Sequence, residues 1–108
     1  MTTTTIQEGS THITLINVFS VDPQNQDQLI RLLSEATEAA MKKQPGFVSA
    51  NIHKSLDGTR VVNYAQWRSE EDFSKMLKNP EAGQHMKKAA ALAEHEPHLY
   101  TVSAVHSA

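Results

Sequence analysis

The stretch that decides the fold is FVSANIHKSLDGTRVVNYAQWR, residues 47–68. It holds two runs rich in β-branched and aromatic residues, 47–56 and 59–68, on either side of Asp57-Gly58. Such runs are typical of strands. Asp-Gly is favoured in two-residue hairpin turns, because both turn positions adopt a positive φ. The sequence therefore predicts an antiparallel hairpin closed by a two-residue turn.

A two-residue turn also predicts the register of the hairpin. The expected opposite pairs, which share one face, are Leu56/Thr59, Ile52/Asn63, Ala50/Ala65 and Val48/Trp67. The other face carries Phe47, Ser49, Asn51, His53, Val62, Tyr64 and Gln66. The first face is apolar apart from Asn63 and has small residues at its centre, so we expect a ligand pocket there. The second face mixes large and polar side chains, which favours an interface between two copies of the chain.

A strand and a helix are predicted before the hairpin. Ile13–Val21 is rich in Ile, Val and Phe and is the expected first strand. Asp22 can cap a helix whose first position suits Pro23. Helical spacing of apolar residues continues to Lys43, and Pro45-Gly46 ends the helix.

Two helical segments and a strand are predicted after the hairpin. Ser69 and Asp72 resemble a capping box, and Asn79-Pro80 begins a second segment. We expect that segment to end at Glu96-Pro97 and a last strand to follow at Leu99–Val105. The order β-α-β-β-α-β predicts an α+β fold of the ferredoxin-like kind, with both helices on one face of an antiparallel sheet.

Composition narrows the function classes. Ten Lys and Arg stand against twelve Asp and Glu among 108 residues, a net charge of −2, so no nucleic acid partner is expected. No apolar run approaches the ~18 residues of a membrane span, so no membrane partner is expected either. The absence of Cys excludes a disulfide framework and a thiolate metal site. We expect a single domain at residues 12–108 behind a flexible tail at residues 1–11, in a cytoplasmic protein.

Three short motifs of the hairpin region resemble a known family. They are Pro45-Gly46-Phe47, Asp57-Gly58-Thr59 and Asn63-Tyr64-Ala65-Gln66-Trp67. Together they resemble the antibiotic biosynthesis monooxygenase family. This resemblance implies a homodimer of ferredoxin-like subunits that form a dimeric α/β barrel. It also implies a pocket between the sheet and the helices of each subunit.

The same resemblance implies catalytic roles for two residues. In a family member, an Asn and a Trp in the motif N-x-x-x-W bind the substrate's oxygens and assist oxygenation without metal or flavin. They match Asn63 and Trp67. The implied reaction is the oxidation by O2 of a phenolic, anthrone-like or quinol polycycle to a quinone, with no cofactor. A Tyr and an Arg of that member match Phe73 and the neighbourhood of Met86.

Oxygenation also moves protons, and His is the side chain suited to that near neutral pH. His85 flanks the apolar face of the last helical segment and is the predicted acid or base. The residues predicted to bind substrate are Asn17, Ala50, Ala65, Phe73, Met76 and Met86. His95 and His98 lie on either side of Pro97 in a predicted loop, where their spacing is a weak indication of metal binding, and no metal is predicted.

Two other functions remain open at this point. One is a dimeric α/β barrel that binds a hydrophobic ligand without chemistry. The other is a haem-binding or haem-degrading member of the same superfamily. The resemblance permits the second, because Asn17 matches an Asn of the haem-degrading branch and His85 lies near the position of its iron ligand.

Overall fold

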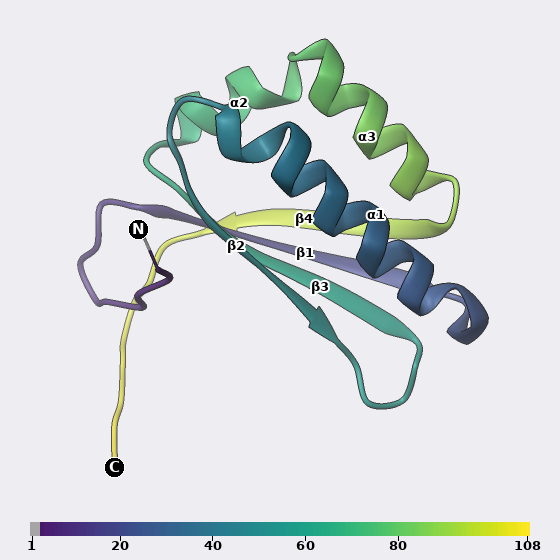
Figure 1. Ribbon diagram of the computed structural model, residues 1–108. Helices are drawn as coiled ribbons and strands as arrows, with labels where there is room; N and C mark the ends of the chain where they lie inside the picture. Colours follow the sequence, from purple (N-terminus) through teal and green to yellow (C-terminus); the bar gives the residue numbers. More distant parts are fainter. Residues whose placement is uncertain (1–2) are drawn as a thin grey trace.

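The computed structural model describes residues 3–108, and within them four antiparallel strands form one sheet in the order β2-β3-β1-β4. The elements in chain order are β1 (Ile13–Val21), α1 (Gln26–Ala39), β2 (Phe47–Lys54), β3 (Arg60–Trp67), α2 (Glu70–Leu77), α3 (Pro80–Ala90) and β4 (Ala93–Tyr100). All three helices lie on one face of the sheet (Figure 1). The predicted ferredoxin-like fold is therefore confirmed, with the second helix divided into α2 and α3.

Helices α2 and α3 begin where the predicted capping residues lie. Ser69 Oγ accepts a hydrogen bond from the Asp72 N–H at 3.1 Å and begins α2. Asn79 does the same for α3 through the Ala82 N–H.

The first helix is shorter than predicted at both ends. Asp22 caps a 3₁₀ turn at Pro23–Asn25, and α1 begins only at Gln26. At the other end α1 stops at Ala39, and a 3₁₀ turn at Met41–Lys43 replaces its last turn.

The β2–β3 hairpin has the predicted register but a longer loop. Ile52 lies opposite Asn63 and Ala50 opposite Ala65, as expected. The prediction of a two-residue turn was wrong. The last hydrogen bond between the strands runs from the Ser55 N–H to the Arg60 carbonyl at 3.1 Å, so residues 56–59 form the loop. The loop is longer by one residue on each side, so the register of the strands does not change.

Asp57 holds this loop together. Its carboxylate accepts hydrogen bonds from the backbone N–H of Thr59 at 3.0 Å, from the Thr59 hydroxyl at 2.7 Å and from the Ser55 hydroxyl at 2.8 Å. These hydrogen bonds lower the pKa of Asp57 from 3.8 to about 2. Because the pKa is lower in the folded protein, the stabilisation is present above pH 4 to 5 and is lost as the pH falls toward about 2.

A β-bulge at the start of β2 changes which residues face the helices. Phe47 lies opposite Trp67, and the register shifts before Ser49, so the predicted pairing of Val48 with Trp67 was wrong. The bulge turns Phe47 toward the helices, although the simple alternation of side chains placed it on the other face. Its ring meets the Trp67 indole edge to face, with ring centroids 5.5 Å apart.

The last strand begins earlier than predicted. Helix α3 ends at Ala90 and β4 begins at Ala93, so Pro97 lies inside the strand rather than before it. Proline is tolerated there because β4 is an edge strand that pairs with β1 alone, and a missing N–H on the free side of an edge removes no ladder bond. The prediction of a strand at Leu99–Val105 was therefore wrong in its bounds.

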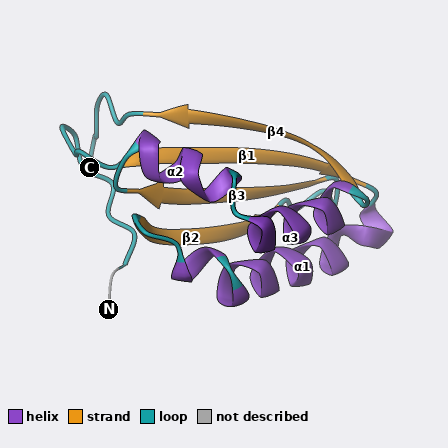
Figure 2. Ribbon diagram, turned by 90° about the horizontal axis from the view of Figure 1, so that it is seen from above, coloured by secondary structure: helices purple, strands orange, loops and turns teal. Residues whose placement is uncertain are grey.

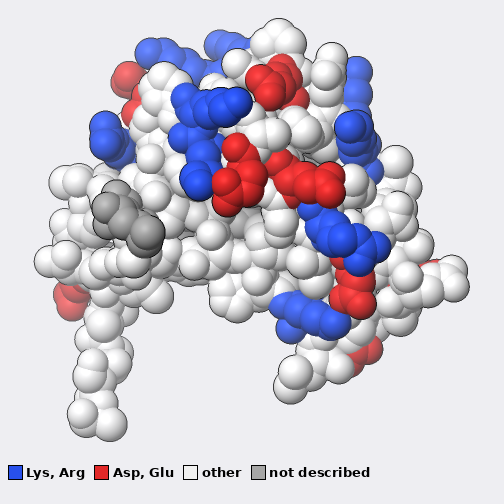
Figure 3. All heavy atoms as spheres, in the orientation of Figure 1, with Lys and Arg blue, Asp and Glu red and all other residues white. Residues whose placement is uncertain are grey.

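Two buried clusters join the helices to the sheet. Leu15, Ala65, Trp67, Phe73, Met76 and Ala82 form the first. Phe19, Val21, Leu29, Val61 and Ala89 form the second. Figure 2 shows α2 at one end of the helical layer and α1 beside α3 at the other. Basic and acidic side chains are intermixed over this layer on the face drawn in Figure 3.

The opposite face of the sheet carries no helix within residues 3–108 (Figure 1). Part of the N-terminal segment lies against it, since the Thr4 hydroxyl donates to Ser49 Oγ at 2.7 Å and Gln66 Nε2 donates to the Thr5 carbonyl at 2.8 Å. Residues 1–2 of the predicted tail lie outside the described residues. In the described part of the chain, no helix combines the length and apolar character needed to cross a membrane.

Gly46 offers a test of this packing. Its φ is +85°, and a Cβ built on it would overlap the Asp72 side chain at the start of α2. We expect Gly46→Ala to lower the free energy of unfolding by about 2 kcal/mol or more, measured by urea denaturation. Gly83→Ala is the matched control, because a Cβ there meets nothing within 4 Å and lies in α3. That control should be neutral or stabilising by up to about 1 kcal/mol. Equal effects of the two substitutions would contradict this packing.

Candidate active site

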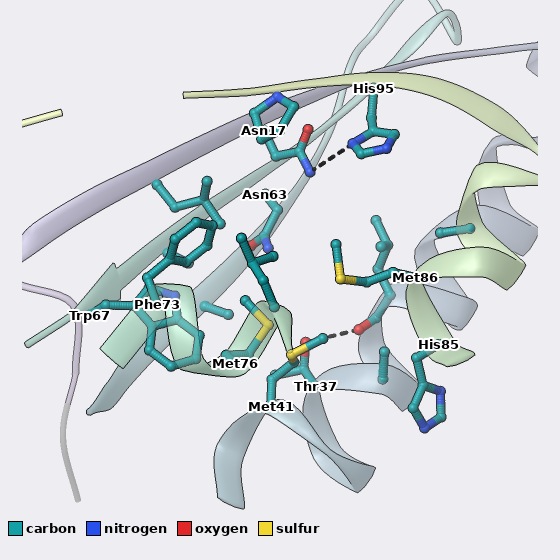
Figure 4. A pocket seen from close by; sticks show the side chains of 18 of the residues that line it. Asn17, Thr37, Met41, Asn63, Trp67, Phe73, Met76, His85, Met86 and His95 are labelled. Carbon is teal, nitrogen blue, oxygen red and sulfur yellow. Dashed lines mark hydrogen bonds between the residues drawn. The ribbon is translucent and has the colours of Figure 1, made fainter. Parts of the chain in front are cut away.

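A cavity of about 200 Å³ lies between the sheet and the helices, where the two buried clusters meet. Its lining is mostly apolar, and Figure 4 shows the side chains that surround it. The sheet contributes Leu15, Asn17, Phe19, Phe47, Ala50, Asn63, Ala65, Trp67, His95, Pro97, His98 and Leu99. The helical layer contributes Leu33, Ala36, Thr37, Met41, Phe73, Met76, Leu77, His85, Met86 and Ala89.

The fold brings every predicted site residue to this cavity. The predicted catalytic residues Asn63, Trp67 and His85 line it, and so do Asn17, Ala50, Ala65, Phe73, Met76 and Met86. The face of the hairpin that was predicted to form a pocket is the face that lines it. The chemical roles of these residues stay predictions.

Two asparagines lie side by side on the floor of the cavity. Asn17 on β1 is the direct partner of Asn63 on β3. Because side chains alternate along a strand, both project to the helical face together with the Leu15/Ala65 pair. The Asn17 amide also contacts His95 on β4, with Asn17 Nδ2 3.5 Å from His95 Nδ1.

Three buried polar atoms of the cavity lack hydrogen-bond partners within residues 3–108. They are the amide oxygens of Asn17 and Asn63 and the indole Nε1 of Trp67. Leaving such a group unpaired costs about 1–3 kcal/mol, so buried polar groups in proteins are normally paired. Three of them around one apolar cavity are typical of a site that a ligand completes. A ligand with hydroxyl groups and a carbonyl would match two acceptors and one donor.

The Trp67 indole is held rigidly in this site. It is 1% exposed, and its ring meets Phe47 and Phe73 edge to face with centroids 5.5 and 5.9 Å away. Such contacts favour a fixed ring orientation over rotation. The indole N–H is therefore presented to the cavity in a set direction, as a donor for an oxygen of a bound molecule needs.

The two histidines of the cavity differ in how they face the asparagines. His85 lies on α3, and its ring is directed away from Asn63 and Trp67 (Figure 4). This orientation gives no support to His85 as an iron ligand paired with Asn17. His95 projects from β4 toward Asn17 and stacks on Phe19, with ring centroids 5.5 Å apart.

Sequence reasoning did not select His95, because it placed that residue in a loop. The alternation of Ala93, His95, Pro97 and Leu99 is the signal that indicates one face of a strand. Thr37 near the end of α1 and Met41 in the 3₁₀ turn after it were also missed. They reach the cavity because α1 crosses the sheet there, which no local pattern indicates.

Within residues 3–108, no group of three or more His, Cys, Asp or Glu is placed so that it could hold a metal ion. The H-x-x-H pair, His95 and His98, lines the cavity but belongs to no such group, and His98 Nε2 contacts Glu96 Oε1 at 3.4 Å. The polar side-chain groups of the cavity are amides, an indole, imidazoles and the Thr37 hydroxyl. They are suited to hydrogen bonding and proton transfer.

Comparison with known proteins shows which family the chain resembles. Residues 12–88 match the family described as antibiotic biosynthesis monooxygenase. Tetracenomycin-F1 monooxygenase of Streptomyces glaucescens is 43% identical over 93 residues, which cover 86% of this chain and 83% of that protein.

Two solved structures share the fold. A monooxygenase from the gene ActVA-Orf6 of Streptomyces coelicolor, in complex with the ligand nanaomycin D, is 28% identical with a TM-score of 0.79, covering 89% of this chain and 91% of that one. SnoaB, a cofactor-independent oxygenase from Streptomyces nogalater, is 26% identical with a TM-score of 0.70, covering 87% of this chain and 95% of that one. The family match spans most of the chain and includes β1, the hairpin and most of the helical layer. The chain therefore belongs to the antibiotic biosynthesis monooxygenase family, which confirms both the resemblance and the expected enzyme class.

Proposed function

We propose that this chain is a cofactor-independent monooxygenase that uses O2 to oxidise a phenolic, anthrone-like or quinol polycycle to a quinone. The observation that carries the proposal is the set of three unpaired polar atoms, on Asn17, Asn63 and Trp67, around one apolar cavity. Further support comes from the relatives, one of which is named a tetracenomycin monooxygenase and another a cofactor-independent oxygenase.

The proposed reaction relies on the substrate to activate oxygen. Ordinary organic molecules react slowly with ground-state O2, and most oxygenases delegate this step to a cofactor. An anthrone-like polycycle becomes easily oxidised once it loses a methylene proton and forms an enolate. The enolate reacts with O2 to form a carbon–oxygen bond, and loss of water from the resulting hydroperoxide leaves a carbonyl group. Each turnover converts one CH2 group and one O2 molecule into one C=O group and one water.

Asn63 and Trp67 are placed to assist enolate formation. Trp67 Nε1 donates to the substrate oxygen on which negative charge develops, and the Asn63 amide binds a neighbouring oxygen. Donors that are fixed before the reaction stabilise such charge without having to reorganise. The apolar walls formed by Phe73, Met76 and Met86 pack on flat rings and keep water away, and methionine adapts to irregular shapes.

The uncovered face of the sheet is the proposed homodimer interface. Apolar positions alternate along β1 and β3 on that face and include Ile16, Val18, Val62 and Tyr64, all of which are half-buried in the single chain. A second copy that covers this face would remove their remaining surface from water and join the two sheets. We also propose that the protein is located in the cytoplasm.

Oxygen uptake tests the proposed activity. Metal-free protein supplied with dithranol, an anthrone, should consume O2 well above the uncatalysed rate. The double variant Asn63→Ala, Trp67→Phe should lose about 10²-fold or more of this rate, because it lacks the amide and the indole N–H that stabilise the enolate. Asn25→Ala is the matched control, since that side chain makes no capping hydrogen bond and lies outside the cavity. Uptake by the wild type that only equals the uncatalysed rate would refute the activity.

Stability offers an independent test of the unpaired amide. Asn63→Leu should raise the free energy of unfolding by about 1 kcal/mol while it reduces turnover, because it replaces an unpaired buried amide with an apolar side chain of similar size. Asn51→Leu is the control on the neighbouring strand, where the amide donates to the Tyr64 carbonyl at 3.1 Å, and it should destabilise the protein. Urea denaturation of both variants measures the two free energies of unfolding. A loss of stability in Asn63→Leu would contradict an unpaired amide.

Sedimentation velocity tests the dimer. The wild-type chain should sediment as a species of twice 12.0 kDa. Val62→Lys places a charge at the centre of the uncovered face and should shift the protein to monomer. Ser34→Lys, on the exposed side of α1, should leave the dimer intact. A wild-type monomer at micromolar concentration would contradict the proposed interface.

A further inference from the structure

His95 is an ionisable side chain in contact with the asparagine pair of the site. Its ring extends from β4 toward Asn17 (Figure 4), with Nδ1 3.5 Å from Asn17 Nδ2. Stacking on Phe19 holds the ring from a second direction, with ring planes 22° apart. We propose that His95 is the base that removes the substrate's methylene proton and that Asn17 positions its ring. This inference rests on the proposed function and names the group that moves its proton.

The unpaired oxygen of Asn17 favours this pairing. A half turn of the Asn17 amide places Oδ1 toward His95 Nδ1, which then donates its N–H to that oxygen. In this arrangement Oδ1 gains the partner that it otherwise lacks, and Nδ2 takes its former position as the unpaired polar atom of Asn17. His95 Nε2 keeps a free lone pair, as a base needs. When Nε2 accepts a proton, the amide oxygen also stabilises the imidazolium ion through the same hydrogen bond.

The position of His95 at the edge of the sheet suits proton exchange. β4 is the edge strand, and His95 is exposed on one side while the other side lines the cavity. A proton taken from a bound molecule can therefore pass to solvent without opening the cavity. A buried base would need a separate relay for that step.

The other ionisable groups near His95 are less well placed. β1, which packs beside it, contains no ionisable residue. Of the ionisable residues of α3, His85 alone lines the cavity, and its ring is directed away from the asparagines. Glu94 and Glu96 lie on the opposite face of β4. His98 also lines the cavity, but its Nε2 contacts Glu96 Oε1 at 3.4 Å, and within residues 3–108 no hydrogen bond joins its ring to Asn17. The α1 residues that line the cavity are Leu33, Ala36 and Thr37, which carry no charge.

The proposed step balances with O2 as the oxidant. His95 Nε2 takes one methylene proton, and the C–H electron pair moves into the ring system to form the enolate, whose oxygen Trp67 holds. The enolate then passes its electrons to O2 as the carbon–oxygen bond forms, and the imidazolium returns its proton to the peroxide. Loss of the second C–H proton to His95 breaks the O–O bond, and the departing hydroxide takes that proton and leaves as water.

Hydrogen–deuterium exchange separates this step from oxygenation. Anaerobic dithranol in D2O exchanges its methylene hydrogens when a base removes them, and NMR follows the loss of their signal. Wild-type protein should accelerate the exchange above buffer, and His95→Gln should reduce the acceleration about 10²-fold. His106→Gln is the matched control, because His106 is exposed and lies outside the cavity, and it should exchange within about twofold of wild type. Imidazole should restore exchange to His95→Ala, because the truncated side chain lies at an exposed edge.

The pH profile provides a readout that a structural role would not move. The wild-type exchange rate should fall on the acid side, as the base becomes protonated, and His95→Gln should lack this acid limb. Asn17→Asp should move the limb to higher pH, because a carboxylate beside Nδ1 stabilises the imidazolium. An unchanged rate and profile in His95→Gln, or no acceleration by the wild type, would overturn His95 as the base. Normal exchange without O2 uptake would instead refute the proposed oxygenation and leave His95 as the base.

Discussion

The pairing of β1 with β3 is the interaction on which the candidate site depends. Its register sets Asn17 opposite Asn63, and the alternation of the strands then turns both amides to the helical face. A slip by one residue would send both to the opposite face and replace them with apolar neighbours. The two apolar clusters hold this register, because they bury the residues next to the asparagines on the helical face. These are Leu15 and Phe19 on β1 and Val61 and Ala65 on β3. Packing of the core and placement of the site are thus one constraint.

The cavity combines two properties that oppose each other energetically. Its apolar walls favour exclusion of water, and its three unpaired polar atoms are disfavoured in such surroundings. A rigid scaffold allows the polar atoms to stay unpaired inside these apolar walls. Trp67 is clamped between two phenyl rings, and the asparagines lie on adjacent strands in the middle of the sheet. The protein therefore keeps hydrogen-bonding groups in fixed directions, and a ligand that pairs with them recovers their cost.

The edge strand connects this rigid floor to solvent. β4 pairs on one side only, so it accepts Pro97 opposite Asn17 and leaves one side of His95 exposed. A group at such an edge can face both the cavity and water, which a residue of β1 or β3 cannot do. The central strands and the edge strand therefore have different roles. The central strands hold the groups that bind substrate oxygens, and the edge strand holds the group that exchanges protons.

Local sequence patterns by themselves determined the element order, the hairpin register and the cavity-facing positions of Ala50, Asn63 and Ala65, because alternation and turn residues act over a few positions. Tertiary structure decided the rest. The bulge that turns Phe47 inward follows from how β2 packs at its start, and the acceptance of Pro97 follows from the position of β4 at the edge of the sheet. The contact between Asn17 and His95 joins residues 78 positions apart. No local pattern contains it, because only the pairing of the first strand with the last brings the two side chains together.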